Sequence, residues 1–310
     1  MTRPRGILCV NYIAKLLDFC GMGLRGETSG LKMTENVLPE ISVKPFLKWA
    51  GGKTSLLQEI LPLVPAIDAG SCYWEPFVGS ATIFFSVKPA RAVLSDLNSK
   101  LMDCYKAVRD YPDDVYALLR THYRCHSREH FYNVRDQFNT SSGLTEQAAR
   151  FIYLNKSCFN GLYRENRKAE FNVPCGNRAK PAFLTLEGLR SASFLLRSAE
   201  LIHSSFECMI ENIRRGDFVY CDPPYTVMHE NNGFIKYNAR LFSWEDQKKL
   251  RLYMDELTTR GAKVLISNAA HSSIKELYQD YDILELTRSS CISANRINRV
   301  KVSEYLIKNY

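Results

Sequence analysis

The chain has 310 residues, of which 45% are hydrophobic and 24% charged, a composition that is typical of a globular protein and argues against wholesale disorder. The 41 Lys and Arg residues against 33 Asp and Glu give a net charge of +8, which fits a polyanionic partner without requiring one. No stretch approaches the ~20 uninterrupted apolar residues of a membrane helix. We therefore expect no membrane span. The ten cysteines include no Cys-x-x-Cys pair, so we also expect no disulfide framework and a cytoplasmic protein.

Residues 1–43 are poorly patterned and predict an N-terminal extension, with Met33 as an alternative start. The next segment, FLKWAGGKT at residues 46–54, ends in a Gly-Lys-Thr sequence that is typical of a phosphate-binding P-loop. A P-loop needs a glycine five positions before the second glycine of that sequence, and Leu47 stands there instead. By itself the segment therefore predicts a Gly-Gly turn before an ordinary helix.

From residue 72 onward, short apolar runs alternate with helical patterns, which predicts a mostly parallel sheet wrapped by helices on both faces. The expected strands are CYWEPFV (72–78), AVLSDL (92–97), FVYCDPP (218–224), KVLISN (263–268), DILELT (282–287) and SEYLIKN (303–309). One helix is expected over SSIKELYQD (272–280). Another begins at Trp244, with Ser243 as the N-cap and Asp246 at the third position.

Residues 101–205 contain helical patterns, such as LMDCYKAVRD and EQAARFIYLN, and no clear buried strand. Within 155–180, basic residues outnumber acids and aromatic residues are interleaved: Lys156, Arg164, Arg167, Lys168, Arg178 and Lys180 against Glu165 and Glu170, with Phe159, Tyr163 and Phe171. We predict that 101–205 is an insertion that divides an α/β domain into residues 44–100 and 206–310.

The segment YWEPFVGSAT (73–82) predicts a strand that ends at Glu75-Pro76-Phe77, followed by Gly79 and small residues leading into a helix. In a doubly wound sheet, the turn after the first strand is where a nucleoside cofactor lies against the backbone. About 20 residues further on, Asp96 ends the next strand, where an acid is well placed to bind ribose hydroxyls. Together the two features indicate an adenosine-binding site.

The segment FVYCDPPY (218–225) runs an apolar strand directly into Asp222, two prolines and Tyr225. Proline removes backbone donors and leaves carbonyl acceptors, so a carboxylate beside such a carbonyl suits a ligand with two N–H donors, as in an exocyclic amine. Tyr225 offers a flat face for stacking. The alternative for the segment alone is a plain turn, because Asp-Pro-Pro is good turn chemistry.

Four residues on one helical stretch suggest a zinc-binding module: His122, Cys125, His126 and His130. A structural zinc site takes four ligands, usually as two separated pairs, and no second pair accompanies this group. We therefore expect no metal.

Six segments in one order resemble the Dam-type (D12 class) DNA adenine-N6 methyltransferases: FLKWAGGK, EPFVGS, LSDLN, YLNKSCFNGLYREN, EFNVPCG and VYCDPPY. The resemblance runs from about residue 45 to residue 310. It implies a Rossmann-like S-adenosylmethionine-dependent methyltransferase sheet with helices on both faces, plus an inserted, mainly helical target-recognition domain. It also implies S-adenosylmethionine as cofactor and double-stranded DNA as partner, with adenine methylated most often within GATC, and we expect a monomer.

Carried over residue by residue, the resemblance implies three groups of site residues. The cofactor-binding group is Trp49, Lys53, Glu75, Phe77, Gly79, Asp96 and Asp222. The catalytic group is Asp222, Pro223, Pro224 and Tyr225. The DNA-binding group is Lys48, Phe159, Asn160, Leu162, Arg164, Pro174 and Arg178. Phe159 would fill the space beside a departed base, and Arg164 would read a guanine edge, since arginine pairs bidentately with guanine O6 and N7.

The resemblance also implies a mechanism in which the target adenine flips out of the duplex. Tyr225 would stack on it, while the Asp222 carboxylate and the Pro223 carbonyl accept the two N6 hydrogens. The chain departs from the family pattern at Ala81, where a second glycine is usual, at Phe159, where tyrosine is frequent, and at Asn177, which precedes Arg178 where a basic residue is common.

Three alternatives stay open from the sequence: an N4-cytosine methyltransferase, a methyltransferase of protein glutamine side chains, and a catalytically silent DNA-binding homologue. The first two usually carry Ser or Asn at the position of Asp222.

Overall fold

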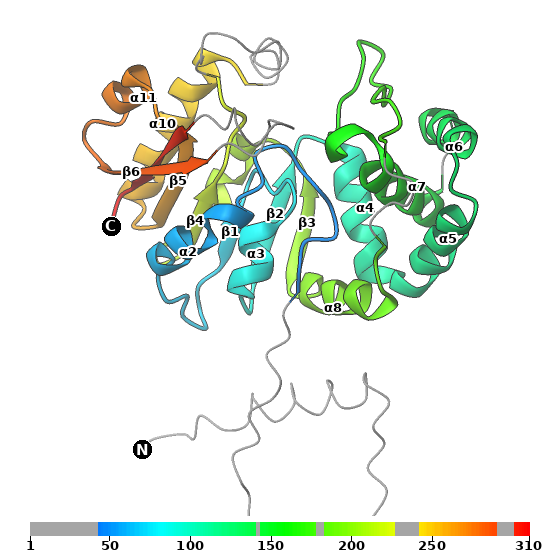
Figure 1. The fold of residues 1–310 in the computed structure, drawn as a ribbon. Helices are drawn as coiled ribbons and strands as arrows, with labels where there is room; N and C mark the ends of the chain where they lie inside the picture. Colours follow the sequence, from blue (N-terminus) through cyan, green and yellow to red (C-terminus); the bar gives the residue numbers. More distant parts are fainter. Residues whose placement is uncertain (1–42, 141–142, 178–182, 227–241, 290–300) are drawn as a thin grey trace, which may run out of the picture. The chain divides into compact units, whose positions relative to one another are not determined.

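The computed structural model describes residues 43–140, 143–177, 183–226, 242–289 and 301–310, which belong to one compact unit spanning residues 41–310 (Figure 1). The N-terminal extension predicted over residues 1–43 lies outside these residues except for Val43. Across the ranges just given, no helix is long and apolar enough to cross a membrane.

Seven strands form one mixed sheet in the order β3-β2-β1-β4-β5-β7-β6. They are β1 (Tyr73–Glu75), β2 (Ala92–Asp96), β3 (Ala199–His203), β4 (Phe218–Cys221), β5 (Lys263–Ala269), β6 (Asp282–Ser289) and β7 (Lys301–Lys308). The pairs from β3 to β5 are parallel, whereas β7 lies antiparallel between β5 and β6. Every strand expected from the sequence is present, and the α/β methyltransferase-like sheet is confirmed.

The strand order reverses between β1 and β4, which pair side by side although much of the chain separates them. At such a switch point the connections leave in opposite directions, and a crevice opens beyond the carboxyl ends of the strands. Three predicted acids lie at these ends: Glu75 ends β1, Asp96 ends β2 and Asp222 directly follows β4. The fold therefore brings them to one edge of the sheet.

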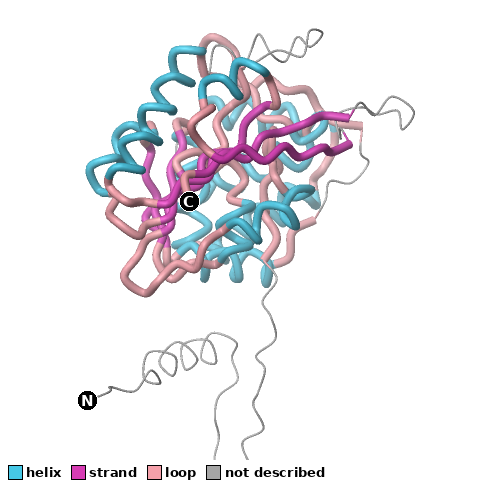
Figure 2. Tube along the Cα trace, turned by 90° about the vertical axis from the view of Figure 1, so that its left-hand side faces the viewer, coloured by secondary structure: helices cyan, strands magenta, loops and turns pink. Residues whose placement is uncertain are grey.

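Each central strand is apolar on both sides because both faces of the sheet are covered. On β4, Phe218 and Tyr220 join one buried cluster, while Val219 and Cys221 join the other. Figure 2 shows the strands as a twisted layer with helices on either side. The sheet is thus the shared centre of two hydrophobic cores.

The helices and 3-10 turns before β3 are η1 (Thr54–Leu56), α2 (Leu57–Ile60), η2 (Leu61–Leu63), α3 (Thr82–Val87), α4 (Ser99–Asp110), α5 (Pro112–Arg124), α6 (Arg128–Thr140), α7 (Leu144–Ser157), η3 (Phe159–Gly161) and α8 (Leu186–Leu196). After β3 come η4 (Phe206–Asn212), α10 (Trp244–Thr259) and α11 (Ser272–Leu277). The capping box predicted for α10 is present, because Ser243 and Asp246 exchange side-chain and backbone hydrogen bonds. The expected helix over 272–280 is α11, which ends at Leu277.

One expectation about the segment 101–205 is wrong: it contains β3, which pairs with β2 along its whole length. The rest of the segment is helical as expected, and Figure 1 shows α4 to α8 gathered beside the β3 edge of the sheet. Buried residues of α4 and α7, such as Tyr105 and Phe151, belong to the same hydrophobic cluster as Tyr220 of the sheet. The separation of this segment as an inserted domain remains a prediction.

Candidate active site

The turn after β1 is built around Gly79, which has a φ of +45°. A Cβ atom at this position would lie 2.7 Å from Trp49 Cδ1, so only glycine lets the backbone and the indole approach this closely. The Gly79 N–H donates to Asp96 Oδ2 at 3.1 Å, and the Asn98 N–H donates to Oδ1 at 3.0 Å. The ends of β1 and β2 are therefore tied together through one carboxylate, with Trp49 against the turn.

Ala81 follows in the same turn with a φ of +54° and is fully buried. The left-handed region costs a residue with a Cβ about 1–2 kcal/mol. Alanine in place of the family's usual glycine therefore strains the backbone at this position, while its methyl group is accommodated in the core.

Trp49 is held in place by an aromatic stack. Its ring lies 5.3 Å from that of Tyr163 at 20°, and 6.3 Å from that of Phe151 at 17°. The indole thus links the β1 turn to α7 and to the loop that follows it.

Lys53 occupies the centre of a buried polar cluster and is only 2% exposed. Its ammonium group lies 2.7 Å from Asp222 Oδ1 and 3.5 Å from Glu304 Oε2. It also donates to the Gly51 carbonyl at 2.9 Å and to the Tyr225 hydroxyl at 3.0 Å. The lysine of the rejected P-loop sequence is therefore a partner of carboxylates.

Glu304, from β7, also belongs to this cluster and was not among the residues predicted from the sequence. Its side chain is fully buried, and its Oε2 accepts the Tyr225 hydroxyl at 2.7 Å. In the sequence it stands as a glutamate at the start of the apolar run Tyr305, Leu306 and Ile307, and the structure buries all four side chains.

Glu75 lies at the end of β1 and is 3% exposed. Its Oε2 accepts the Tyr73 hydroxyl at 2.7 Å and the Phe84 N–H at 3.2 Å. Burial raises the pKa of Glu75 to about 8, with the two hydrogen bonds opposing the shift and the charge of Asp222 adding to it. At neutral pH this acid is therefore mostly protonated, in contrast to an ordinary glutamate.

The predicted DNA-contacting residues lie on two antiparallel segments after α7. The Phe159 N–H donates to the Pro174 carbonyl at 3.0 Å, and the Arg164 guanidinium donates through Nε to Asn172 Oδ1 at 2.8 Å. Phe159 is 48% exposed, and Asn160 has a φ of +55°. The structure thus brings Phe159, Asn160, Leu162, Arg164 and Pro174 into one short two-stranded loop.

Asn155, which was not among the predicted site residues, joins this loop to the FLKWAGGK segment. The side chain is 1% exposed and exchanges two 2.8 Å hydrogen bonds with the backbone of Lys48. Its Nδ2 also donates to the Gly161 carbonyl at 3.3 Å. Lys48 is thereby held against the loop. Burial, together with the nearby charge of Lys48, lowers the pKa of Lys156 to about 8.

Two predicted residues lie apart from these groups. Phe77 packs on the opposite face of the sheet, with its ring 5.4 Å from that of Phe206 and 5.7 Å from that of Phe242. Arg178 lies outside the described residues. The individual roles assigned to the site residues remain predictions.

The histidines considered for a zinc module pack around Tyr153 instead. His122 Nδ1 lies 3.2 Å from His130 Nε2, and His126 Nδ1 lies 2.8 Å from the Tyr153 hydroxyl oxygen. Within the described ranges, no group of three or more His, Cys, Asp or Glu residues could hold a metal ion.

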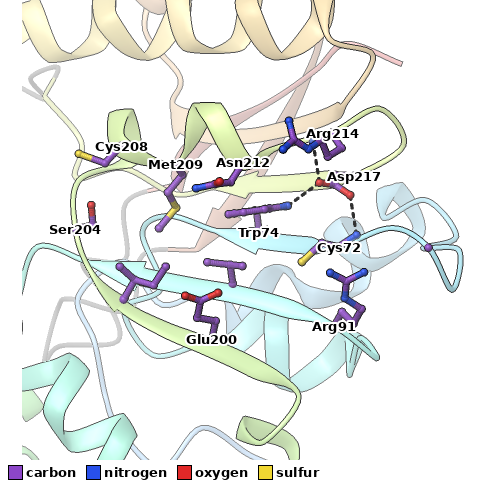
Figure 3. Close-up of a pocket in the computed structure, with 13 residues that line it drawn as sticks. Cys72, Trp74, Arg91, Glu200, Ser204, Cys208, Met209, Asn212, Arg214 and Asp217 are labelled. Atoms are coloured by element: carbon purple, nitrogen blue, oxygen red, sulfur yellow. Dashed lines mark hydrogen bonds between the residues drawn. The ribbon is translucent and has the colours of Figure 1, made fainter.

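A cavity of about 460 Å³ lies on the sheet face that η4 covers (Figure 3). It contains none of the predicted site residues. Asp217, which lines it before β4, accepts the Cys72 N–H at 2.8 Å, the Trp74 Nε1–H at 3.0 Å and the Arg214 N–H at 3.0 Å. These bonds satisfy Asp217 structurally, and the cavity reaches the amino ends of the strands, with neither Asp96 nor Asp222 in its lining.

Comparison with known proteins gives a consistent result. Residues 49–291 match the family model described as D12 class N6 adenine-specific DNA methyltransferase. The chain is 36% identical over 277 residues to the type II methyltransferase M1.LlaDCHI of Lactococcus lactis subsp. cremoris, covering 87% of this chain and 97% of that protein. It is 35% identical over 289 residues to the type II methyltransferase M.MjaIII of Methanocaldococcus jannaschii, covering 87% and 100%. It is 35% identical over 271 residues to the DNA adenine methylase of Escherichia coli (strain K12), covering 85% and 94%.

Proposed function

Because the chain belongs to the D12 class of N6 adenine-specific DNA methyltransferases, we propose that it transfers the methyl group of S-adenosylmethionine to an adenine flipped out of duplex DNA, within GATC. Family membership sets aside the N4-cytosine and protein-glutamine alternatives. The observation that carries the proposal is the contact of Lys53 with both Asp222 and Tyr225 at the switch point of the sheet.

The residues at the β1 and β2 ends fit S-adenosylmethionine. Glycine at position 79 lets Trp49 approach the backbone of the turn, and Asp96 offers carboxylate oxygens beside it for ribose hydroxyls. Trp49 adds an apolar wall next to the same turn. When bound, the cofactor supplies an electrophilic methyl group on a sulfonium.

Asp222 is suited to the acceptor role because it is partly exposed and fixed from one side. Its side chain is 18% exposed, while Lys53 holds Oδ1 at 2.7 Å. With the Pro223 carbonyl, the carboxylate would accept the two N6 hydrogens and turn the nitrogen lone pair toward the methyl group. The rate enhancement then comes from positioning and electrostatics rather than from a covalent intermediate.

Tyr225 would stack on the flipped adenine. Its hydroxyl is anchored by Lys53 and Glu304, so the hydroxyl end of the ring is held in position before the base arrives. A stacking surface that is already oriented loses less conformational entropy when the base binds.

The loop after α7 is the proposed DNA-contacting surface. Exposed Phe159 would fill the space left by the adenine, and Arg164 would read guanine. Because Asn172 engages Arg164 through Nε, this contact leaves the two terminal NH2 groups to serve as the fork that bidentate pairing with guanine would need.

The proposal is tested by incubating purified protein with plasmid DNA and S-adenosylmethionine and mapping the modified bases. We expect N6-methyladenine in GATC and none with Asp222→Ala. Unmodified DNA, modified cytosine, or full activity of Asp222→Ala would each contradict the assignment. Binding should also weaken steeply with salt, because phosphate contacts release counterions.

A further inference from the structure

Glu304 combines complete burial with a charged side chain at the edge of the sheet where the candidate site lies. In β7 it pairs with Ala269 of β5 and with Leu286 of β6, which places it between two strands. Its neighbours Tyr305, Leu306 and Ile307 are all buried and apolar in character. An apolar residue would satisfy the same packing, whereas burying a carboxylate is costly unless it is paired and hydrogen-bonded.

The hydrogen bonds around Glu304 have a fixed direction. An ammonium group has three donors and no acceptor, so the Tyr225 hydroxyl oxygen must accept the hydrogen bond from Lys53. The hydroxyl proton of Tyr225 then points to Glu304 Oε2, 2.7 Å away. Burial, reinforced by the charges of Asp222 and Glu304, raises the pKa of Tyr225 well above its ordinary value, so the hydroxyl keeps this proton.

The chain of contacts therefore runs from Glu304 through Tyr225 and Lys53 to Asp222. Lys53 lies 5.0 Å from the centre of the Tyr225 ring, so the ammonium also faces the ring that the hydroxyl bond orients. If the carboxylate is removed, the Tyr225 hydroxyl loses its acceptor and the hydroxyl end of the ring gains freedom to move. Lys53 at the same time loses one of the two carboxylates it contacts.

We propose that Glu304 is a positioning residue of the methyl transfer: it fixes the Tyr225 ring and the Lys53 ammonium so that the flipped adenine meets a preset stacking surface and a preset Asp222. This inference rests on the proposed function. Glu304 does not touch the adenine in this scheme and acts through the Tyr225 hydroxyl.

The test compares Glu304→Gln, Tyr225→Phe and the double variant, with Glu285→Gln as a matched control. Glu285 is an exposed glutamate on β6, opposite Tyr305 in the register of the neighbouring strand. Glutamine keeps the size of Glu304, and Tyr225→Phe keeps the buried carboxylate, so the two variants disturb the same contact from opposite sides. The measurements are kcat, the KM for DNA, the thermal midpoint, and the fluorescence of 2-aminopurine at the target position, which rises when the base leaves the stack.

We expect Glu304→Gln and Tyr225→Phe each to lower kcat on the order of 10-fold to 100-fold, with little change in the KM for DNA. The kcat of the double variant should be little lower than that of either single variant, because both changes remove the same hydrogen bond between Tyr225 and Glu304. At saturating protein, both should alter the 2-aminopurine signal, since the base is held less firmly. Glu285→Gln should match the wild type.

Three results would overturn the inference: kcat of Glu304→Gln within twofold of the wild type, a double variant that loses the product of the two single effects, or an unchanged 2-aminopurine signal despite a lowered thermal midpoint. The last is the pattern of a residue that only stabilises the fold. A wild-type protein that methylates no adenine would instead refute the proposed function, so the two failures are distinguishable.

Discussion

Lys53→Met should make the stability of the protein strongly pH-dependent. The substitution removes the ammonium that lies 2.7 Å from Asp222 and 3.5 Å from Glu304, in a site where the lysine is 2% exposed. Removing one partner of a buried ion pair typically costs about 3–5 kcal/mol, because the other partner keeps a buried charge. A carboxylate can limit this cost by taking up a proton.

The cost of that proton follows from the pH. Holding an aspartate protonated, with an ordinary pKa of about 3.9, costs about 1.4 kcal/mol per pH unit above that value. The deficit of Lys53→Met should therefore be about 1.5 kcal/mol at pH 5 and about 4 kcal/mol at pH 7. In the variant, the carboxyl group of Asp222 is expected to have a higher pKa in the folded protein than in the unfolded chain. The stability of the variant is therefore greatest at low pH and is lost as the pH rises.

Urea unfolding of the wild type and the variant at several pH values measures this deficit. Lys308→Met is the control, since its partner Asp282 is 75% exposed, and such surface pairs contribute about 1 kcal/mol or less. A Lys53→Met deficit that is equal at pH 5 and pH 7 would mean that the loss comes from packing, and the electrostatic reading of the cluster would be refuted.

Three further substitutions test other parts of the site. Because burial raises the pKa of Glu75 to about 8, its contribution to stability is lost as the pH rises from about 4.5 to 8. In urea titrations, the unfolding free energy of Glu75→Gln relative to the wild type should therefore increase by about 2 kcal/mol between pH 6 and pH 8. A difference that stays constant over this range would contradict the reasoning. Gly79→Ala places a Cβ 2.7 Å from Trp49 in a left-handed backbone, so it should destabilise the protein by about 1–2 kcal/mol and weaken S-adenosylmethionine binding in calorimetry. Phe159→Ala should leave the thermal midpoint unchanged, because the ring is 48% exposed, but cost about 1–3 kcal/mol of DNA binding, whereas Phe183→Ala, at 54% exposed, should leave binding unchanged.

The strands that carry the site could be predicted from the sequence because their burial is continuous. Strands covered on both faces read as uninterrupted apolar runs, and those ending at Glu75, Asp96 and Asp222 are of this kind. A carboxylate directly after such a run is conspicuous. The position of these acids at one edge then follows from the parallel sheet.

The strand β3 escaped prediction because it lies at the edge of the sheet and buries little. Its sequence, AELIH, exposes Glu200 and His203 and follows directly on the helical pattern of α8. What makes it a strand is its pairing with β2, where Val93 faces Glu200. That pairing is a long-range contact, which no local pattern encodes.

The role of Glu304 was hidden for a related reason. A glutamate in a strand ordinarily faces solvent, and burial becomes tolerable only through partners from elsewhere in the chain. Those partners, Lys53 and Tyr225, come from the segment before β1 and the segment after β4. The resemblance to the methyltransferase family therefore named Lys53 and Tyr225 singly but could not show that one buried carboxylate joins them.

This shared contact also gives the lysine of the Gly-Gly-Lys-Thr sequence partners that differ from those of a P-loop lysine. A P-loop lysine works because its loop wraps the phosphate with backbone N–H groups. In this protein the ammonium instead donates to the Gly51 carbonyl, Asp222 and Tyr225, which together use its three protons. The same residue type in a similar local sequence thus becomes a bridge between a candidate catalytic acid and a candidate stacking ring, and the antiparallel strand β7 supplies the carboxylate that fixes the bridge in place.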